Sequence, residues 1–198
     1  LLEFSEDKYE VFKLEWIPPK PDESIESYAR RMSKKVTRPA PVLIGVSFGG
    51  ILVQEMQPFV QAKKIIIISS IKHENEMPFR MRLTRITGLY KLVPKKLSVD
   101  LDKLAKYVFG KKIKKRLNLY KKHLYLCDDY YLKWSIETII HWKQKRNFDN
   151  LIHIHGEKDE VFPSNKISNF VPVSNGTHIM IINRYKWFNA HLEKYIQS

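Results

Sequence analysis

Short apolar runs alternate along the chain with stretches of helical periodicity. Residues 41–46 and 64–69 are almost wholly apolar, which is typical of parallel strands that are buried on both faces. Residues 9–16 alternate polar and apolar side chains and predict another strand before them. Apolar positions at helical spacing predict one helix over residues 25–36 and another over residues 49–61. This order of strands and helices indicates an α/β fold.

The same alternation returns in the C-terminal part of the chain. A helix is predicted around residues 136–145, followed by strands at residues 151–155 and 170–173. A final helix is predicted to begin soon after His178. Together with the first half of the chain, this pattern predicts a mostly parallel sheet that is flanked by helices on both faces.

Between the two halves, residues 71–131 show helical patterns without strands between them, as at residues 101–109. The positive charge is concentrated there: the net charge is +14, and residues 72–146 hold 20 Lys and Arg against 7 Asp and Glu. Such a segment attracts anions such as substrates, phospholipid headgroups or nucleic acid, although a solvated helical face has the same composition. We therefore expect a single domain over residues 1–198, with a basic helical cap inserted at residues 71–131.

The sequence GVSFGG lies between a predicted buried strand and a predicted helix, and it contains Ser47. A serine hydroxyl becomes a useful nucleophile only when it is exposed beside a base and a site for the developing oxyanion. A tight strand-to-helix turn exposes it and brings the residues two before and two after together, so glycine is expected there. Gly45 and Gly49 occupy these positions, and Gly50 lets the helix approach the sheet. The amide of Phe48 would then face the carbonyl under attack.

Two later loops carry the other groups of such a site. HGEKDEVFP, with Asp159, follows the strand predicted at residues 151–155, and NGTH, with His178, follows the last predicted strand. These motifs resemble the α/β-hydrolase family, which has the elbow, an H-G-x-x-D-x-x-x-P pattern and G-x-H in this order. The resemblance spans nearly the whole chain. It implies the α/β-hydrolase fold with Ser47 as nucleophile, His178 as base, Asp159 as the acid that orients it, and the Phe48 amide as one oxyanion donor.

Other carboxylates compete for the role of the acid. Glu157 and Glu160 flank Asp159, but the family pattern selects Asp159. Asp128 and Asp129 lie in the insertion, before the helix that leads to the strand at residues 151–155, and are therefore less suitable.

Metal and cofactor sites are not expected. His153 and His155 would face the same side of their strand, but no second cluster has metal-ligand spacing, so packing and loop hydrogen bonding are favoured. The single cysteine, Cys127, cannot form an internal disulfide and favours a reducing, cytoplasmic compartment.

The chain departs from the family in one respect. The family's second oxyanion donor comes from a loop after an early strand, and nothing like that loop occurs before Tyr9. That strand would lie between the strands predicted at residues 9–16 and 41–46, so its absence would leave backbone groups unpaired. We therefore expect an upstream segment with one strand and a glycine-containing loop, which the intact mass of the natural protein would test. Without it, the strand at residues 9–16 would have to move inward.

These features favour a carboxyl-ester or thioester hydrolase that acts through an acyl-enzyme on a small acyl substrate, either anionic or lipid-like. A non-catalytic binding protein on a hydrolase scaffold is the alternative, and contact with an anionic membrane through the basic cap is another. No motif supports sequence-specific nucleic-acid binding.

Overall fold

A computed structural model describes residues 2–4, 7–87, 129–144 and 146–198. Within this part of the chain, four parallel strands form one sheet in the order β1-β2-β3-β4. The strands are β1 (Val42–Val46), β2 (Lys64–Ile68), β3 (Leu151–Gly156) and β4 (Val171–Val173). The strands predicted at residues 41–46, 64–69, 151–155 and 170–173 are thus confirmed. Because they are parallel, their carboxyl ends meet at one edge of the sheet.

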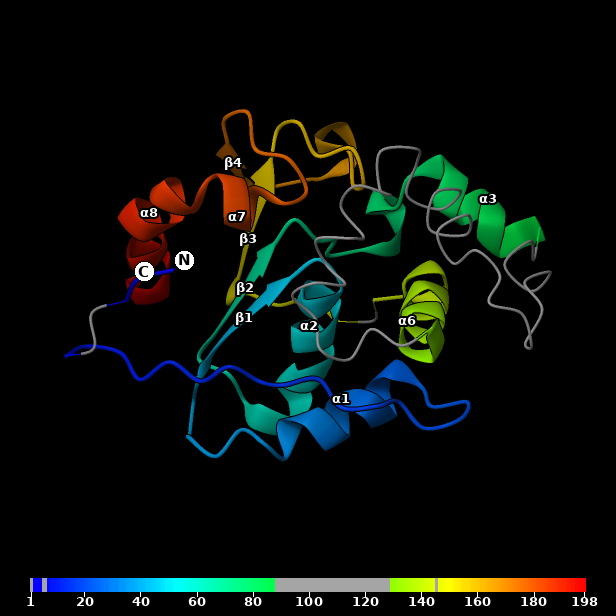
Figure 1. The fold of residues 1–198 in the computed structure, drawn as a ribbon, viewed down its shortest axis with the longest axis horizontal. Coiled ribbons are helices and arrows are strands. Elements are labelled where there is room, and N and C mark those ends of the chain that lie inside the picture. Colours follow the sequence, from blue (N-terminus) through cyan, green and yellow to red (C-terminus); the bar gives the residue numbers. More distant parts are fainter. Residues whose placement is uncertain (1, 5–6, 88–128, 145) are drawn as a thin grey trace.

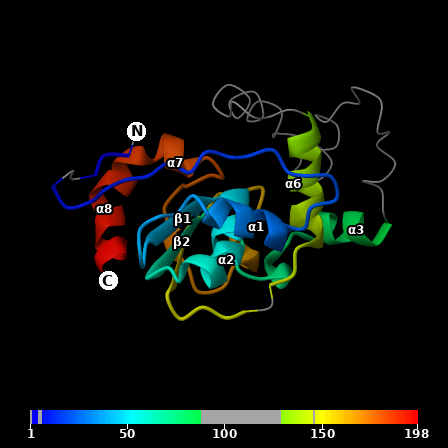
Figure 2. The same cartoon turned by 90° about the horizontal axis from the view of Figure 1, so that it is seen from below.

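Helices cover both faces of this sheet (Figures 1 and 2). One face carries α1 (Ile25–Ser33), α2 (Phe48–Val60) and α6 (Asp129–His141), and α3 (Phe79–Thr87) lies beside α6. The other face carries α7 (Met180–Asn183) and α8 (Tyr185–Gln197). Single 3₁₀ turns occur at Glu74–Glu76 and Ser164–Lys166. The mostly parallel sheet flanked by helices is therefore confirmed.

Strand β2 shows why its sequence is apolar at every position after Lys64. Ile65 and Ile67 belong to the core under α1, α2 and α6, whereas Ile66 and Ile68 belong to the core under α8. All four are fully buried. Alternate side chains of a strand point to opposite faces, so a strand between two helical layers needs apolar residues in both sets.

The prediction of a strand at residues 9–16 is wrong. These residues are irregular, and they run from the α8 side of the sheet to the α1 side (Figures 1 and 2). Leu14 and Trp16 pack on the core, while Val11 and Phe12 are more than half exposed. Strand pairing requires a neighbouring ladder, and in the described structure β1 pairs only with β2. The segment did not move inward to join β1, and the expected upstream strand stays a prediction.

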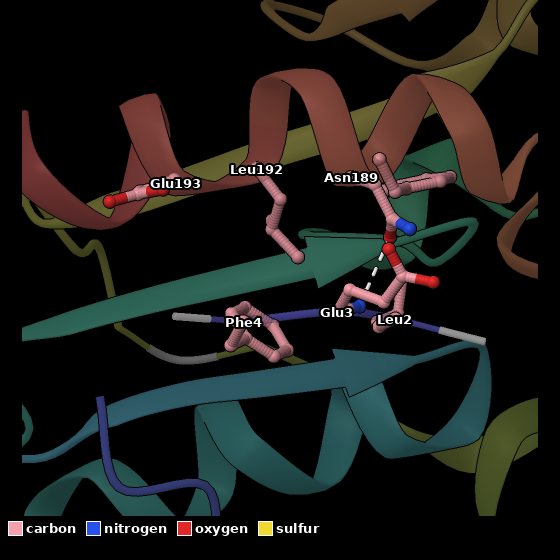
Figure 3. A pocket seen from close by; sticks show the side chains of 7 residues that line it. Leu2, Glu3, Phe4, Asn189, Leu192 and Glu193 are labelled. Carbon is pink, nitrogen blue, oxygen red and sulfur yellow. Dashed lines mark hydrogen bonds between the residues drawn. The ribbon is translucent and has the colours of Figure 1, made fainter. Parts of the chain in front are cut away.

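The first described residues pack beside α8. Leu2 and Phe4 lie beside Leu192, and the Glu3 amide donates to Asn189 Oδ1 at 3.2 Å (Figure 3). This contact forms a small pocket that contains none of the predicted catalytic residues.

The helix predicted around residues 136–145 begins earlier, at Asp129, and ends at His141. Tyr131 and Trp134 lie one helical turn apart and are both buried against the core. Their packing stabilises an additional N-terminal part of the helix. Of the predicted insertion, residues 88–128 lie outside the described residues, including the helix expected at residues 101–109. Among the residues that the structure describes, no helix is both long enough and apolar enough to span a membrane.

Candidate active site

Ser47 occupies a tight turn between β1 and α2. Its backbone has φ 54° and ψ −119°, a conformation that is strained for a residue with a side chain. Its amide donates to Ile68 O (2.9 Å), and its carbonyl oxygen accepts from the Gly50 amide (2.9 Å). The half-buried serine is therefore held in a strained conformation at the carboxyl end of the sheet, as the elbow pattern predicts.

The glycines of this turn have different roles. A Cβ atom on Gly45 would lie 2.1 Å from Gly49 O, and a Cβ atom on Gly50 would lie 2.4 Å from Ser70 Oγ. A Cβ atom on Gly49 would only reach ordinary contact with Trp16, at 3.9 Å. Gly45 and Gly50 must therefore lack a side chain, because a Cβ atom at either position would overlap a neighbouring atom. Gly49 contributes its backbone to the close approach, and the expectation that it must lack a side chain is wrong on this geometry.

Two further groups complete the surroundings of Ser47. Ser70 Oγ donates to the Ser47 carbonyl oxygen at 2.7 Å, a contact that the sequence pattern did not reveal. Phe48 is the first residue of α2, so its amide has no acceptor within the helix and points out of the positive end of the helix dipole. The Phe48 amide is thus available to an oxyanion formed at Ser47.

The structure brings the three predicted catalytic side chains together. His178 Nε2 lies 2.9 Å from Ser47 Oγ, and His178 Nδ1 lies 2.9 Å from Asp159 Oδ2. His178 and Asp159 are both buried, at 3% exposed each. Ser47 follows β1, Asp159 follows β3 and His178 follows β4, so only the pairing of the strands makes them neighbours. Each distance permits a hydrogen bond, and the histidine lies between the other two side chains.

The loop after β3 holds the Asp159 carboxylate in one orientation. Its Oδ1 accepts hydrogen bonds from the backbone amides of Val161 (2.8 Å) and Phe162 (3.0 Å). These two bonds form a local turn in which the aspartate side chain fixes its own loop. The Oδ2 atom is left facing His178.

Two glycines bring the aspartate and histidine loops together. A Cβ atom on Gly156 would lie 2.4 Å from Gly176 O, and one on Gly176 would lie 2.9 Å from Gly156 Cα. The Lys158 amide also donates to Gly176 O at 2.8 Å. Backbone packs on backbone at this point, which brings the loops of Asp159 and His178 into contact.

The surroundings of Asp159 favour its charged form. Burial alone would raise the pKa of this carboxyl, but His178, the hydrogen bond to it, His155 and the Phe162 amide outweigh the burial and lower the pKa below its usual value. The carboxylate is therefore ionised at neutral pH and can orient the imidazole of His178 and stabilise its cation.

This architecture recurs in known structures of low sequence identity. A hydrolase from Pseudomonas aeruginosa PA01 superposes with a TM-score of 0.62 and 13% identity, over 92% of this chain and 75% of that one. An esterase from Exiguobacterium antarcticum gives 0.60 and 16%, over 88% and 74%. A bromoperoxidase from Bacillus anthracis gives 0.56 and 15%, over 87% and 73%. The chain has the α/β-hydrolase fold. No protein-family profile and no curated protein sequence matches it.

Within the α/β-hydrolase fold, the competing carboxylates are placed elsewhere. Glu157 and Glu160 have exposed side chains on either side of the buried Asp159. Asp128 lies outside the described residues.

His153 and His155 face the same side of β3, as expected, and they bond to each other rather than to a metal-binding cluster. His153 Nε2 lies 3.1 Å from His155 Nδ1. Among the described residues of this α/β-hydrolase fold, no group of three or more His, Cys, Asp and Glu side chains could hold a metal ion.

Proposed function

We propose that this protein is a serine hydrolase that cleaves a carboxylic ester or thioester through an acyl-enzyme intermediate. The observation that carries the proposal is the unbroken series of contacts from Ser47 Oγ through His178 to Asp159, with distances of 2.9 Å at both steps. The solved esterase and hydrolase of the same fold support this class of reaction.

The reaction would proceed in two halves. Ser47 Oγ attacks the carbonyl carbon while His178 Nε2 accepts its proton, and the resulting oxyanion binds the Phe48 amide. The tetrahedral intermediate collapses when His178 returns the proton to the departing alcohol or thiol. A water molecule then attacks the acyl-enzyme with His178 again as base, and the carboxylic acid leaves Ser47. Asp159 remains ionised throughout.

We expect an apolar acyl group to bind on the side of the turn that carries Phe48, because an aromatic group lies there. The Trp16 ring stacks on the Phe48 ring at 5.7 Å between centroids, and Trp134 packs edge-on against it at 5.6 Å. Tyr131 completes this aromatic group. With the basic composition of residues 72–146, it supports a small acyl substrate that is lipid-like or carries a negative charge. The basic composition also supports the proposal of peripheral membrane contact, and the single cysteine supports that of a cytoplasmic location.

A fluorophosphonate probe tests the nucleophile directly, because it forms a covalent bond only with an activated serine. We expect the protein to be labelled and Ser47→Ala not to be labelled. Ser174→Ala is the matched control, since Ser174 is an exposed serine beside the histidine loop. Equal labelling of the protein and of Ser47→Ala would refute the assignment of the nucleophile, and absence of labelling would favour a non-catalytic binding protein. A panel of esters that differ in chain length and charge would then define the acyl group.

A further inference from the structure

The hydrogen-bonded series of the active site continues beyond Asp159 into the sheet. We propose that His155, oriented by His153, is a positioning residue that holds the Asp159 loop through the backbone of Phe162. This inference rests on the proposed function, because a positioned acid matters only if Ser47 and His178 carry out the reaction.

Phe162 is held from both sides of its backbone. Its amide donates to Asp159 Oδ1 at 3.0 Å, and its carbonyl oxygen lies 2.8 Å from His155 Nε2. A carbonyl oxygen only accepts hydrogen bonds, so His155 Nε2 carries the hydrogen. His155 therefore donates to the residue that in turn donates to the catalytic carboxylate.

The tautomer of His153 follows from that of His155. A neutral imidazole has one N–H, so His155 Nδ1 is an acceptor when Nε2 is the donor. His153 Nε2, at 3.1 Å, must then donate to it. His153 Nδ1 is then left as the lone pair of a buried ring, with the backbone of Ser70 close to that ring. The two rings thus form a directed pair that ends on the Phe162 carbonyl.

Both rings are neutral in the folded protein. Burial lowers the pKa of His155, with His178 acting in the same direction, while Asp159, the Phe162 carbonyl and Glu76 oppose the shift. Burial lowers the pKa of His153 well below its usual range, the neighbouring His155 and Lys72 add to the shift, and the backbone of Ser70 opposes it. A neutral pair keeps the single pattern of donors and acceptors that the distances require.

His155 contacts the backbone of the loop and does not compete with His178 for the Asp159 carboxylate. Its Nε2 atom lies 3.7 Å from Asp159 Oδ2, beyond hydrogen-bond distance, so that oxygen keeps its short contact with His178 Nδ1. Burying two imidazoles also costs free energy that aliphatic side chains would avoid. The imidazole of His155 supplies a hydrogen bond to the Phe162 carbonyl oxygen that an aliphatic side chain could not make.

Three variants test the proposal. His155→Leu removes the donor and keeps a buried side chain, His155→Gln retains an N–H that can reach the Phe162 carbonyl, and His153→Leu removes the donor behind His155. The matched control is His191→Gln, an exposed histidine on α8. For each we would measure the rate of fluorophosphonate labelling at saturating and limiting probe, thermal unfolding, and the proton resonance of the His178–Asp159 hydrogen bond. Nitrogen NMR of the unmodified protein gives both histidine tautomers without any activity.

We expect His155→Leu to lower the maximal labelling rate at least about tenfold with little change in probe affinity, because a misplaced loop misplaces Asp159. The His178–Asp159 proton resonance should weaken, His155→Gln should restore both signals, and His153→Leu should have a smaller effect in the same direction. Folded His155→Leu that labels at the original rate would overturn the proposal. So would an Nδ1–H tautomer at His155, a result that can be obtained even if His155→Leu does not fold. If the unmodified protein is not labelled, the proposed function fails, and the NMR signals still test the positioning.

Discussion

At the scale of single residues, the site depends on polar groups that are buried and paired. Ser47 keeps its strained backbone because Ile68 O, the Gly50 amide and Ser70 Oγ all bond to its peptide groups. Asp159 keeps its charge because two backbone amides and His178 surround it. Ile68, Ser70 and His178 come from other segments of the chain, so an isolated motif could not maintain the geometry.

The buried histidines of β3 predict a pH dependence of stability. The pKa values of His153 and His155 are lowered in the folded protein, so the unfolded chain binds protons there at pH values where the folded protein does not. The free energy of unfolding should therefore fall as the pH drops below about 6.5, by up to about 1.4 kcal/mol per pH unit for each histidine. Asp159 contributes only at lower pH: its folded pKa is lowered, so its contribution is present above about 3.9 and is lost in stronger acid.

Urea denaturation between pH 7 and pH 5 would measure this slope. The variant His153→Gln, which does not titrate, should reduce the slope, whereas His191→Gln at an exposed position should not. A slope that is the same in His153→Gln and in the unmodified protein would contradict the assignment.

At the scale of elements, α6 is joined to α2 by one buried carboxylate. Trp142, just after α6, donates its indole N–H to Glu55 Oε1 on α2 (2.8 Å). Arg146 forms an ion pair with Glu55 Oε2 (3.1 Å). Glu55 and Trp142 are both nearly fully buried. This contact places the end of α6, and with it Trp134 and the aromatic group beside Phe48, against α2.

Trp142→Phe tests this link, because it keeps an aromatic ring and removes the indole N–H. One buried oxygen of Glu55 then loses its donor, and we expect the free energy of unfolding to fall by about 1–3 kcal/mol. Glu55→Gln retains an oxygen that can accept from the indole and should cost less. Chemical denaturation would compare the two, and a larger loss in Glu55→Gln would show that the Arg146 ion pair dominates instead.

At the scale of the whole molecule, the order of the strands assembles the site. Ser47 follows β1, Asp159 follows β3 and His178 follows β4, and parallel pairing brings these three ends to one edge. The final adjustment is the contact of Gly156 with Gly176, where the backbones of two loops touch.

Gly156→Ala should separate the aspartate and histidine loops, because its Cβ atom would lie 2.4 Å from Gly176 O. A displacement of about 1 Å between Asp159 and His178 should lower the rate of fluorophosphonate labelling about 100-fold. Ser174→Ala, in the same region but exposed, should label at the original rate. If Gly156→Ala is folded and labels normally, this glycine contact does not set the geometry of the site.

The sequence by itself determined the four strands of the sheet and predicted which three side chains would meet at its carboxyl edge. Apolar runs such as residues 64–69 are unambiguous because a strand buried on both faces needs apolar side chains at every position. The order of Ser47, Asp159 and His178, each just after a predicted strand, was also readable. These are local properties, since each depends on a few neighbouring residues.

Only the tertiary structure decided the features that depend on distant partners. Residues 9–16 have the alternation of a strand, but they find no ladder to join and run across the sheet instead. Gly49 matches the elbow pattern, yet the close contacts fall on Gly45 and Gly50. The contacts of Ser70 with Ser47 and of His155 with Phe162 join groups from different strands and loops. Such contacts exist only once the sheet has brought the segments together, which is why the pattern along the chain could not reveal them.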